Sequence, residues 1–254
     1  MTNSSSFEQL RAAIETYRPA ATATIVKGEP VGAKIVMIDG DIAGTFGDAE
    51  LDRQVIARAK EHLGESRSTT EAIGEIEVFF ESFPPPPTLL VFGAVHVAQP
   101  LTSMAKQLGF RVVVIDVRPK LATKDRFPDA DEIVVDWPDV ALEGRTVERD
   151  TAIAILSHDP KFDEPALLGA LATPARYIGA VGSRKTNIDR RQRLRDAGVS
   201  EESIARIHGP IGLDIGANTP EEMAISILAE IIAIWHGRSG GLLAGASGNI
   251  RARD

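Results

Sequence analysis

The chain has 254 residues, a formal net charge of −8 and 43% hydrophobic residues, enough to form one large or two small globular domains. The acidic balance argues against a nucleic-acid or anionic-membrane surface, and the absence of cysteine excludes disulfides, thiolate metal sites and a cysteine nucleophile. No apolar run approaches the roughly 20 residues of a membrane span, and the polar start of the chain is unlike a secretory signal, so we expect a cytoplasmic protein.

Residues 1–83 are predicted to form a small α+β domain. Apolar residues at helical spacing predict a first helix over 7–17, and a second helix is expected over 51–63 with Asp48 as its N-cap. The dipeptide Asp39-Gly40 is a strong signal for a hairpin turn. Extended stretches predict strands over 21–27, 33–38, 42–46 and 69–83.

Four consecutive prolines mark the clearest boundary in the chain. Pro84 to Pro87 favour a stiff polyproline II spacer. The glycine-rich residues 239–254 are expected to form a flexible tail. The sequence therefore predicts two domains, 1–83 and 88–238, joined by the linker 84–87.

The second domain opens with a strand, a glycine turn, a helix and another strand. Residues 88–92 form a buried-strand pattern that leads into Gly93, a helix is expected over 100–109, and a strand pattern over 110–116 ends in Asp116. This order is that of the first unit of a dinucleotide-binding α/β domain, in which the acid contacts the ribose and the helix N-terminus faces the pyrophosphate.

The glycine turn departs from the dinucleotide fingerprint at its centre. Residues 93–98 read Gly-Ala-Val-His-Val-Ala, so Val95 stands where a second glycine normally lets the backbone approach the phosphates. A branched side chain there is expected to obstruct a pyrophosphate. The motif alone leaves two possibilities open: a dinucleotide site, or a Rossmann-like fold that binds no dinucleotide.

The alternation of strands and helices continues along the second domain. Further strands are expected over 132–135, 151–156 and 177–181. Further helices are expected over 164–171, 185–197 and 220–235, and Thr219 with Glu222 forms a capping box at the start of the last. The pattern predicts an α/β fold, a Rossmann-like parallel sheet preceded by the smaller α+β domain.

Polar residues follow two of these strands, at the edge where doubly wound sheets bind their ligands. The pair His158-Asp159 suits acid–base chemistry, although a capped loop is the commoner origin of such an isolated pair. The triplet Gly182-Ser183-Arg184 offers an amide, a hydroxyl and a guanidinium to an anion. The same triplet would also suit an ordinary helix start capped by Ser183.

Other candidate residues are less specific. His208 and Asp214 lie in a glycine-rich loop that suits either a ligand or a plain turn. The basic helix 185–197 is predicted to be a solvated face or a docking patch for an acidic partner. His62 and His236 are expected at the surface, and no two histidines have metal-ligand spacing, so we expect no protein-bound metal.

Several stretches together resemble the XdhC/CoxI family of accessory factors for xanthine dehydrogenase and carbon monoxide dehydrogenase. In the second domain the similar stretches are 92–98, 114–119, 157–159, 177–184 and 207–222, of which 208–222 is the longest and most specific. In the first part of the chain the similarity is weaker and covers 31–34, 44–51 and the proline linker.

The resemblance implies a cofactor chaperone more than a conventional enzyme. Members of the family hold the molybdenum cofactor, promote its sulfuration by a cysteine desulfurase, and deliver it to an apo-molybdoenzyme of the xanthine dehydrogenase or carbon monoxide dehydrogenase type. The cofactor is a phosphorylated pterin, molybdopterin or its dinucleotide form, so phosphate-binding loops suit it as well as they suit NAD(P). We also expect a homo-oligomer.

For such a ligand, the sequence predicts a binding site at the strand ends of the second domain and no catalytic residue. The residues expected to contact the cofactor are Gly93, His96, Asp116, His158, Asp159, Gly182, Ser183, Arg184, His208 and Asp214.

Two departures from the family pattern keep other functions open. Glu50 stands where the family often has a cysteine, and Val95 replaces the middle glycine. One alternative is an NAD(P)-dependent oxidoreductase, with His158 as acid–base and Asp116 on the ribose. The other is a diverged member that only docks to a partner. Val95 and the lack of a recognisable substrate domain favour the chaperone over the oxidoreductase.

Overall fold

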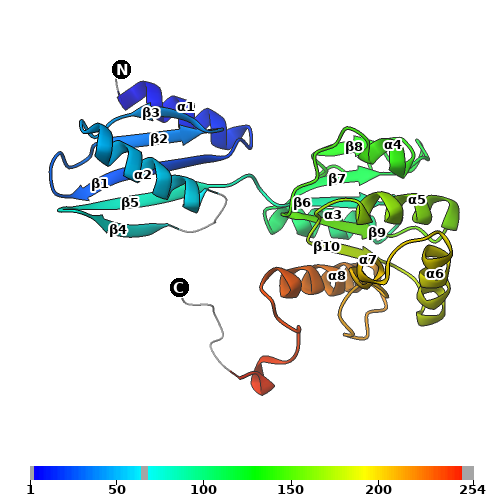
Figure 1. Ribbon diagram of the computed structural model, residues 1–254. Coiled ribbons are helices and arrows are strands. Elements are labelled where there is room, and N and C mark those ends of the chain that lie inside the picture. Colours follow the sequence, from blue (N-terminus) through cyan, green and yellow to red (C-terminus); the bar gives the residue numbers. More distant parts are fainter. Residues whose placement is uncertain (1–2, 64–67, 248–254) are drawn as a thin grey trace. The chain divides into compact units, whose positions relative to one another are not determined.

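The computed structural model describes residues 3–63 and 68–247, and contacts divide the chain into two compact units, Met1–Pro86 and Pro87–Asp254 (Figure 1). The predicted fold class is confirmed, because the first unit contains an antiparallel sheet beside helices and the second a parallel sheet with helices on both faces. In the described ranges, no helix is both long enough and apolar enough to cross a membrane.

The first unit packs helices against a five-stranded antiparallel sheet. The strands are β1 (Ala20–Lys27), β2 (Lys34–Ile38), β3 (Asp41–Gly44), β4 (Thr69–Ile73) and β5 (Ile76–Phe83), in the order β3-β2-β1-β5-β4. Helix α1 (Asn3–Glu15) contacts β1 and β2. Helix α2 (Ala49–His62) buries Val55 and Ala59 against strand residues that include Ile25 and Phe80. These buried side chains belong to the core of this unit.

Local sequence signals explain two features of this unit. Asp39 and Gly40 have φ values of 51° and 91°, so they form the predicted turn between β2 and β3. The Asp48 side chain accepts hydrogen bonds from the amides of Glu50 and Leu51, both at 2.9 Å, and caps α2 as expected.

Two expectations for this unit were wrong. The stretch 69–83 is not a single extended segment, because Gly74 adopts a φ of 62° and folds it into the hairpin of β4 and β5. His62 is not a surface residue, since only 9% of it is exposed. Its Nε2 lies 2.7 Å from Oε1 of Glu71, and its ring packs 5.4 Å from that of Phe80, because the last turn of α2 lies on β4 and β5.

All six strands of the second unit run parallel. They are β6 (Thr88–Phe92), β7 (Arg111–Ile115), β8 (Glu132–Val134), β9 (Thr151–Ile155), β10 (Tyr177–Ala180) and β11 (Ile207–His208). Their order across the sheet is β11-β10-β9-β6-β7-β8. If the strands of this unit are numbered from one, β6 is the first and β9 the fourth, and the order is 6-5-4-1-2-3. The direction in which successive strands are added changes between β6 and β9, as in the doubly wound nucleotide-binding fold.

Helices cover both faces of this sheet (Figure 1). On one face, α3 (Ala98–Gln107) and α8 (Pro220–Trp235) pack on the apolar residues that alternate along the strands, such as Leu89 and Val91. On the other face, the intervening residues Leu90 and Phe92 meet the remaining helices. These are α4 (Pro138–Leu142), α5 (Pro160–Leu171), α6 (Arg184–Asp196) and α7 (Glu201–Ala205).

In the first unit, α1 begins at Asn3, four residues before its predicted start. The helices of the second unit begin within two residues of the predicted positions, with two differences. Helix α4 was not predicted, because its five residues are too few to show a helical period. Helix α5 begins at Pro160 instead of Glu164, since Asp159 caps it and proline is favourable in the first turn. Within the predicted tail 239–254, residues 243–245 form a short 3-10 turn, and residues 248–254 lie outside the described residues.

Candidate functional site

The carboxyl ends of β6 and β9 form the candidate site, because doubly wound sheets open a crevice where their strand order reverses. The loops after these two strands touch. Gly93 has a φ of 108°, and a Cβ placed on it would lie 3.0 Å from the amide nitrogen of Ser157. Glycine is therefore required at this position both by its backbone conformation and by the approach of the second loop.

The glycine turn is held from three directions. The Gly93 amide donates to the Ile115 carbonyl at 2.8 Å, and the Ala94 amide donates to Oδ2 of Asp116 at 2.7 Å. Arg126 donates to the Ala94 carbonyl at 3.0 Å. The next three amides, those of residues 95–97, donate to no atom in the part of the chain that the structure describes, so they are available to an anion at the start of α3.

Val95 and His96 occupy this turn in different ways. The Val95 side chain is partly buried and packs against the core cluster that includes residues of α3 and α8, and its obstruction of a pyrophosphate stays a prediction. His96 is exposed beside the unpaired amides.

Asp116 is an internal anchor of the site. It is 1% exposed, and its carboxylate accepts bonds from the Ala94 amide at 2.7 Å and the Arg118 amide at 2.9 Å. The Arg118 side chain forks onto it from Nε at 2.8 Å and Nη2 at 2.7 Å. Burial alone would raise the pKa of Asp116, but the bonds from Arg118 and Ala94 together outweigh it and lower the pKa below 3.8.

This lowered pKa makes Asp116 a source of pH-dependent stability. A carboxyl whose pKa is depressed by folding adds stability above its unfolded pKa, and that stability is lost as the pH falls through its folded pKa. We therefore expect the free energy of unfolding of Asp116→Asn to change less between about pH 5 and pH 2 than that of the unmodified protein. Urea denaturation at a series of pH values measures this, and parallel acid profiles would contradict it.

The pair His158-Asp159 is a capped loop in this structure and not a dyad. Asp159 caps α5 by accepting the Lys161 amide at 3.0 Å, and its own amide donates to Ser157 Oγ at 3.1 Å. His158 is exposed and makes no hydrogen bond with the described residues. Both residues nevertheless follow β9 closely in the chain, in the loop at its carboxyl end.

The triplet 182–184, which follows β10, combines a helix start capped by Ser183 with a cationic side chain that could bind an anion. Gly182 has a φ of 132°, and Ser183 caps α6 by accepting the Thr186 amide at 3.1 Å. Arg184, the first residue of α6, is exposed and forms no hydrogen bond or ion pair within the described ranges. Arg184 is therefore a cation at the strand-end edge whose donors remain available to a ligand.

A buried ion pair beneath this triplet is not evident from the sequence. Arg190 is 2% exposed and donates to Asp163 at 3.1 Å, to the Val181 carbonyl at 2.9 Å and to Asn187 at 2.6 Å. Burial raises the pKa of Asp163 although the Arg190 charge opposes it. Oδ1 of Asp163 and Nε of Arg190 form no hydrogen bond of acceptable geometry with the described residues, although Ser157 lies close enough to help lower the pKa of Asp163.

The basic helix 185–197 is therefore not the plain solvated face that was expected. Arg190 is buried, and Arg191 donates to the carbonyls of Ile204 and Ile207 at 3.3 Å and 2.8 Å. The sequence carried one signal for this, since Asn187, Arg190 and Leu194 recur at the spacing of an inward helix face.

His208 is held in a polar cluster at the edge strand. Its ring stacks on that of Tyr177, with centroids 4.8 Å apart, and its Nδ1 lies 3.4 Å from Glu230. The Tyr177 hydroxyl and the Gly212 amide also donate to Glu230, at 2.5 Å and 2.7 Å. Glu230 thus fixes the loop after β11, whereas Asp214 further along that loop is exposed and has no partner within the described ranges.

The second unit therefore brings most of the predicted residues to one edge of the sheet. Gly93, His96 and Asp116 surround the ends of β6 and β7, while the loops at 157–159 and 182–184 follow β9 and β10. No group of three side chains able to hold a metal ion is found in residues 3–63 and 68–247.

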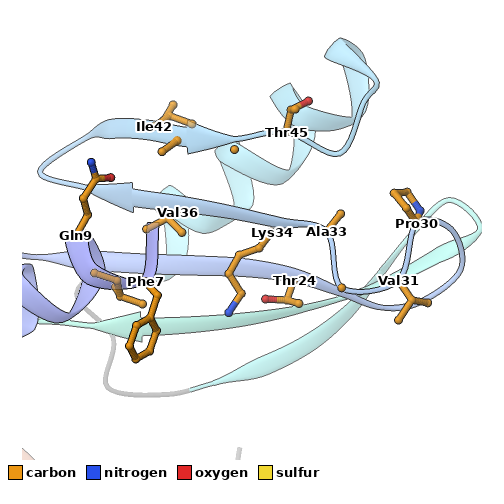
Figure 2. A pocket seen from close by; sticks show the side chains of 14 residues that line it. Phe7, Gln9, Thr24, Pro30, Val31, Ala33, Lys34, Val36, Ile42 and Thr45 are labelled. Atoms are coloured by element: carbon orange, nitrogen blue, oxygen red, sulfur yellow. The ribbon is translucent and has the colours of Figure 1, made fainter. Parts of the chain in front are cut away.

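The first unit has a separate groove of about 1150 Å³. Phe7, Thr24, Lys34, Val36 and Ile42 line it from α1 and three neighbouring strands (Figure 2). The stretches 31–34 and 44–45, on which the weaker resemblance rests, meet at this groove. Glu50 does not line it, and instead pairs with Arg53 on the exposed first turn of α2.

Comparisons with known proteins identify the family. The model of the XdhC Rossmann domain matches residues 89–231, and the model of the XdhC and CoxI family matches residues 13–74. The chain belongs to the XdhC and CoxI family. Each of the two units contains one of these matched regions.

Individual relatives agree with this assignment. The chain is 32% identical over 226 residues to an uncharacterized protein of Escherichia coli, YqeB, covering 82% of this chain and 41% of that protein. It is 32% identical to a Bacillus subtilis protein named as a probable subunit of xanthine dehydrogenase, covering 61% of this chain and 45% of that protein. It is 28% identical to the molybdenum cofactor insertion chaperone PaoD of Escherichia coli, covering 61% and 42%. The chain thus spans less than half the length of these relatives.

A solved structure supports the fold. A protein of Bacillus halodurans described as a xanthine dehydrogenase superposes with a TM-score of 0.56 at 23% identity, covering 95% of this chain and 98% of that one. At this identity the similarity concerns the fold alone.

Proposed function

We propose that this chain binds the molybdenum cofactor at the strand-end crevice of its second unit and delivers it to a molybdoenzyme of the xanthine dehydrogenase or carbon monoxide dehydrogenase type. The observation that carries the proposal is the convergence of anion-binding groups on one edge of the sheet. These are the unpaired amides at the start of α3 and the exposed Arg184 at the start of α6. A relative named as a molybdenum cofactor insertion chaperone supports it.

The residues present fit a phosphorylated pterin. Gly93 and Gly182 let the backbone come close to a ligand, and Arg184 can form a forked pair with a phosphate. When bound, the cofactor would supply the molybdenum centre of the receiving enzyme. This chain holds and releases it, and because the sequence contains no cysteine, any sulfur must come from a partner such as a cysteine desulfurase.

An oxidoreductase is the weaker candidate. Hydride transfer from a nicotinamide needs a dinucleotide seated with its ribose on the acid after β7, yet the Asp116 carboxylate already accepts four internal hydrogen bonds. His158, the proposed acid–base residue, is exposed and lacks an orienting partner within the described ranges.

Arg184→Ala is expected to weaken cofactor binding by roughly ten- to hundred-fold, because it removes a charge-assisted contact of about 1.5–3 kcal/mol. The fold should be retained, since Arg184 is exposed and bonds to none of the described residues. Anaerobic titration with the cofactor measures the affinity, and circular dichroism checks the fold.

Arg149→Ala is a matched control. Arg149 is also exposed, but it precedes β9 and so lies at the amino ends of the strands, opposite the crevice. Its loss should leave the affinity unchanged. Equal affinities in all three folded proteins would remove Arg184 from the site, and failure of the unmodified protein to bind would reject the proposed function.

A further inference from the structure

Asp116, the acid that follows β7, has no lone pair left to accept a hydrogen bond from a ribose hydroxyl. A carboxylate offers about four lone-pair positions, and Asp116 uses four: for the Ala94 amide, the Arg118 amide, Arg118 Nε and Arg118 Nη2. Only 2% of its side chain is exposed. A ribose donates its hydroxyls to the acid at this position in dinucleotide sites, so that mode of recognition is closed here.

Arg118 is the group that this strand end presents instead. Its side chain is 52% exposed, and of its five N–H donors the bonds to Asp116 use one on Nε and one on Nη2. The outer edge of the guanidinium forms no hydrogen bond with the described residues. This edge consists of Nη1 and the second N–H of Nη2. Because Asp116 fixes the guanidinium plane, this outer fork is held in place before any ligand arrives.

Arg118 is also influenced by the charge of a loop on the far side of β6. The carboxylate of Asp159 is close enough to contribute to the raised pKa of Arg118, after the larger contribution of Asp116. Asp159 follows β9, which is on the far side of β6 from β7. The guanidinium therefore lies within electrostatic reach of the loop across the crevice. Asp159 itself is occupied as the cap of α5.

We propose that Arg118 makes this end of the crevice selective for a phosphomonoester and against a ribose diol. The proposal rests on the proposed function, since it concerns the same crevice. The outer fork of Arg118 matches two oxygens of a terminal phosphate, whereas a diol finds neither a free acceptor nor a complementary charge. Of the two forms of the proposed cofactor, molybdopterin, which ends in a phosphate, fits better than the dinucleotide form.

Two ligands that differ by one phosphate test the selectivity. 2′-AMP carries a phosphomonoester where adenosine carries a free ribose hydroxyl, and adenosine has no other phosphate that could occupy the Arg118 fork. Calorimetry should show the unmodified protein binding 2′-AMP about ten-fold or more tightly than adenosine. Arg118→Ala should abolish that preference or reverse it, because it also frees the Asp116 oxygens for a diol.

Two further variants separate selectivity from folding. Arg118→Lys keeps the charge and loses the fork, so it should retain a smaller preference. Arg149→Ala, at the amino ends of the strands, should keep the full preference. Thermal unfolding followed by circular dichroism shows whether each variant is folded, and Arg118→Lys serves as the test if Arg118→Ala is not.

The outcomes distinguish this proposal from the proposed function. The selectivity proposal is wrong if the unmodified protein does not bind 2′-AMP or does not prefer it to adenosine. It is also wrong if folded Arg118 variants keep the full preference, even where the cofactor titration succeeds. If the preference depends on Arg118 but the cofactor does not bind, the selectivity stands and the proposed function fails.

Discussion

Arg190→Met is expected to lower the free energy of unfolding by about 3–5 kcal/mol, because it leaves the Asp163 carboxylate buried without its charge partner. Asp163 is 3% exposed, so water does not replace the lost guanidinium. The same change removes the bonds that Arg190 donates to Val181 and Asn187. Equilibrium urea denaturation measures the loss.

The double variant Asp163→Leu with Arg190→Met is the informative control. Replacing both partners of a buried pair with apolar residues is often neutral or stabilising, so most of the lost stability should return. The two orphaned atoms, Asp163 Oδ1 and Arg190 Nε, would disappear with the pair. A double variant as unstable as the single one would show that the pair itself stabilises the fold.

Gly93→Ala is expected to cost about 2–4 kcal/mol, combining a strained positive φ with overpacking of the second loop. At a φ of 108° an alanine is disfavoured, and its Cβ would press on the Ser157 amide at 3.0 Å. The cofactor site should fail with it, because the turn that presents the amides of residues 95–97 would shift. Denaturation and cofactor titration report the two effects separately.

Gly109→Ala is the control that separates the cost of the positive φ from the cost of the contact with Ser157. Gly109 also has a positive φ, 85°, but a Cβ placed there meets nothing within 4 Å. It should lose only the conformational part, about 1 kcal/mol or slightly more, and leave cofactor binding unchanged. Equal losses at the two glycines would show that the approach of Ser157 carries no energetic weight.

Elements with strong local signals were predictable from the sequence. The apolar runs that became β6, β7 and β9 are buried on both faces, and such strands are continuous in hydrophobic residues. The capping box of Thr219 and Glu222 fixed the start of α8 within its own four residues. These signals depend on residues close together in the sequence, so they can be recognised without knowledge of the fold.

The site was less predictable because its decisive contacts are not local. Arg190 looked like part of a solvated basic helix, since its partner Asp163 lies on another helix. The fingerprint located Asp116 correctly, yet nothing in it indicates that Arg118, two residues further on, turns back and saturates the carboxylate. The sequence also does not show that Val95 is partly buried against the core cluster of this face of the sheet.

The parallel pairing of β6 has a consequence for synthesis on the ribosome. The hairpins of the first unit join strands that are near neighbours in sequence, so they can form soon after they emerge. In contrast, Thr88 of β6 pairs with Thr151 of β9, so the central strand waits with one edge open until β9 has been made. During that interval the apolar segment 89–92 is an aggregation hazard, and a nascent chain stalled before β9 would be the species most in need of a general folding chaperone.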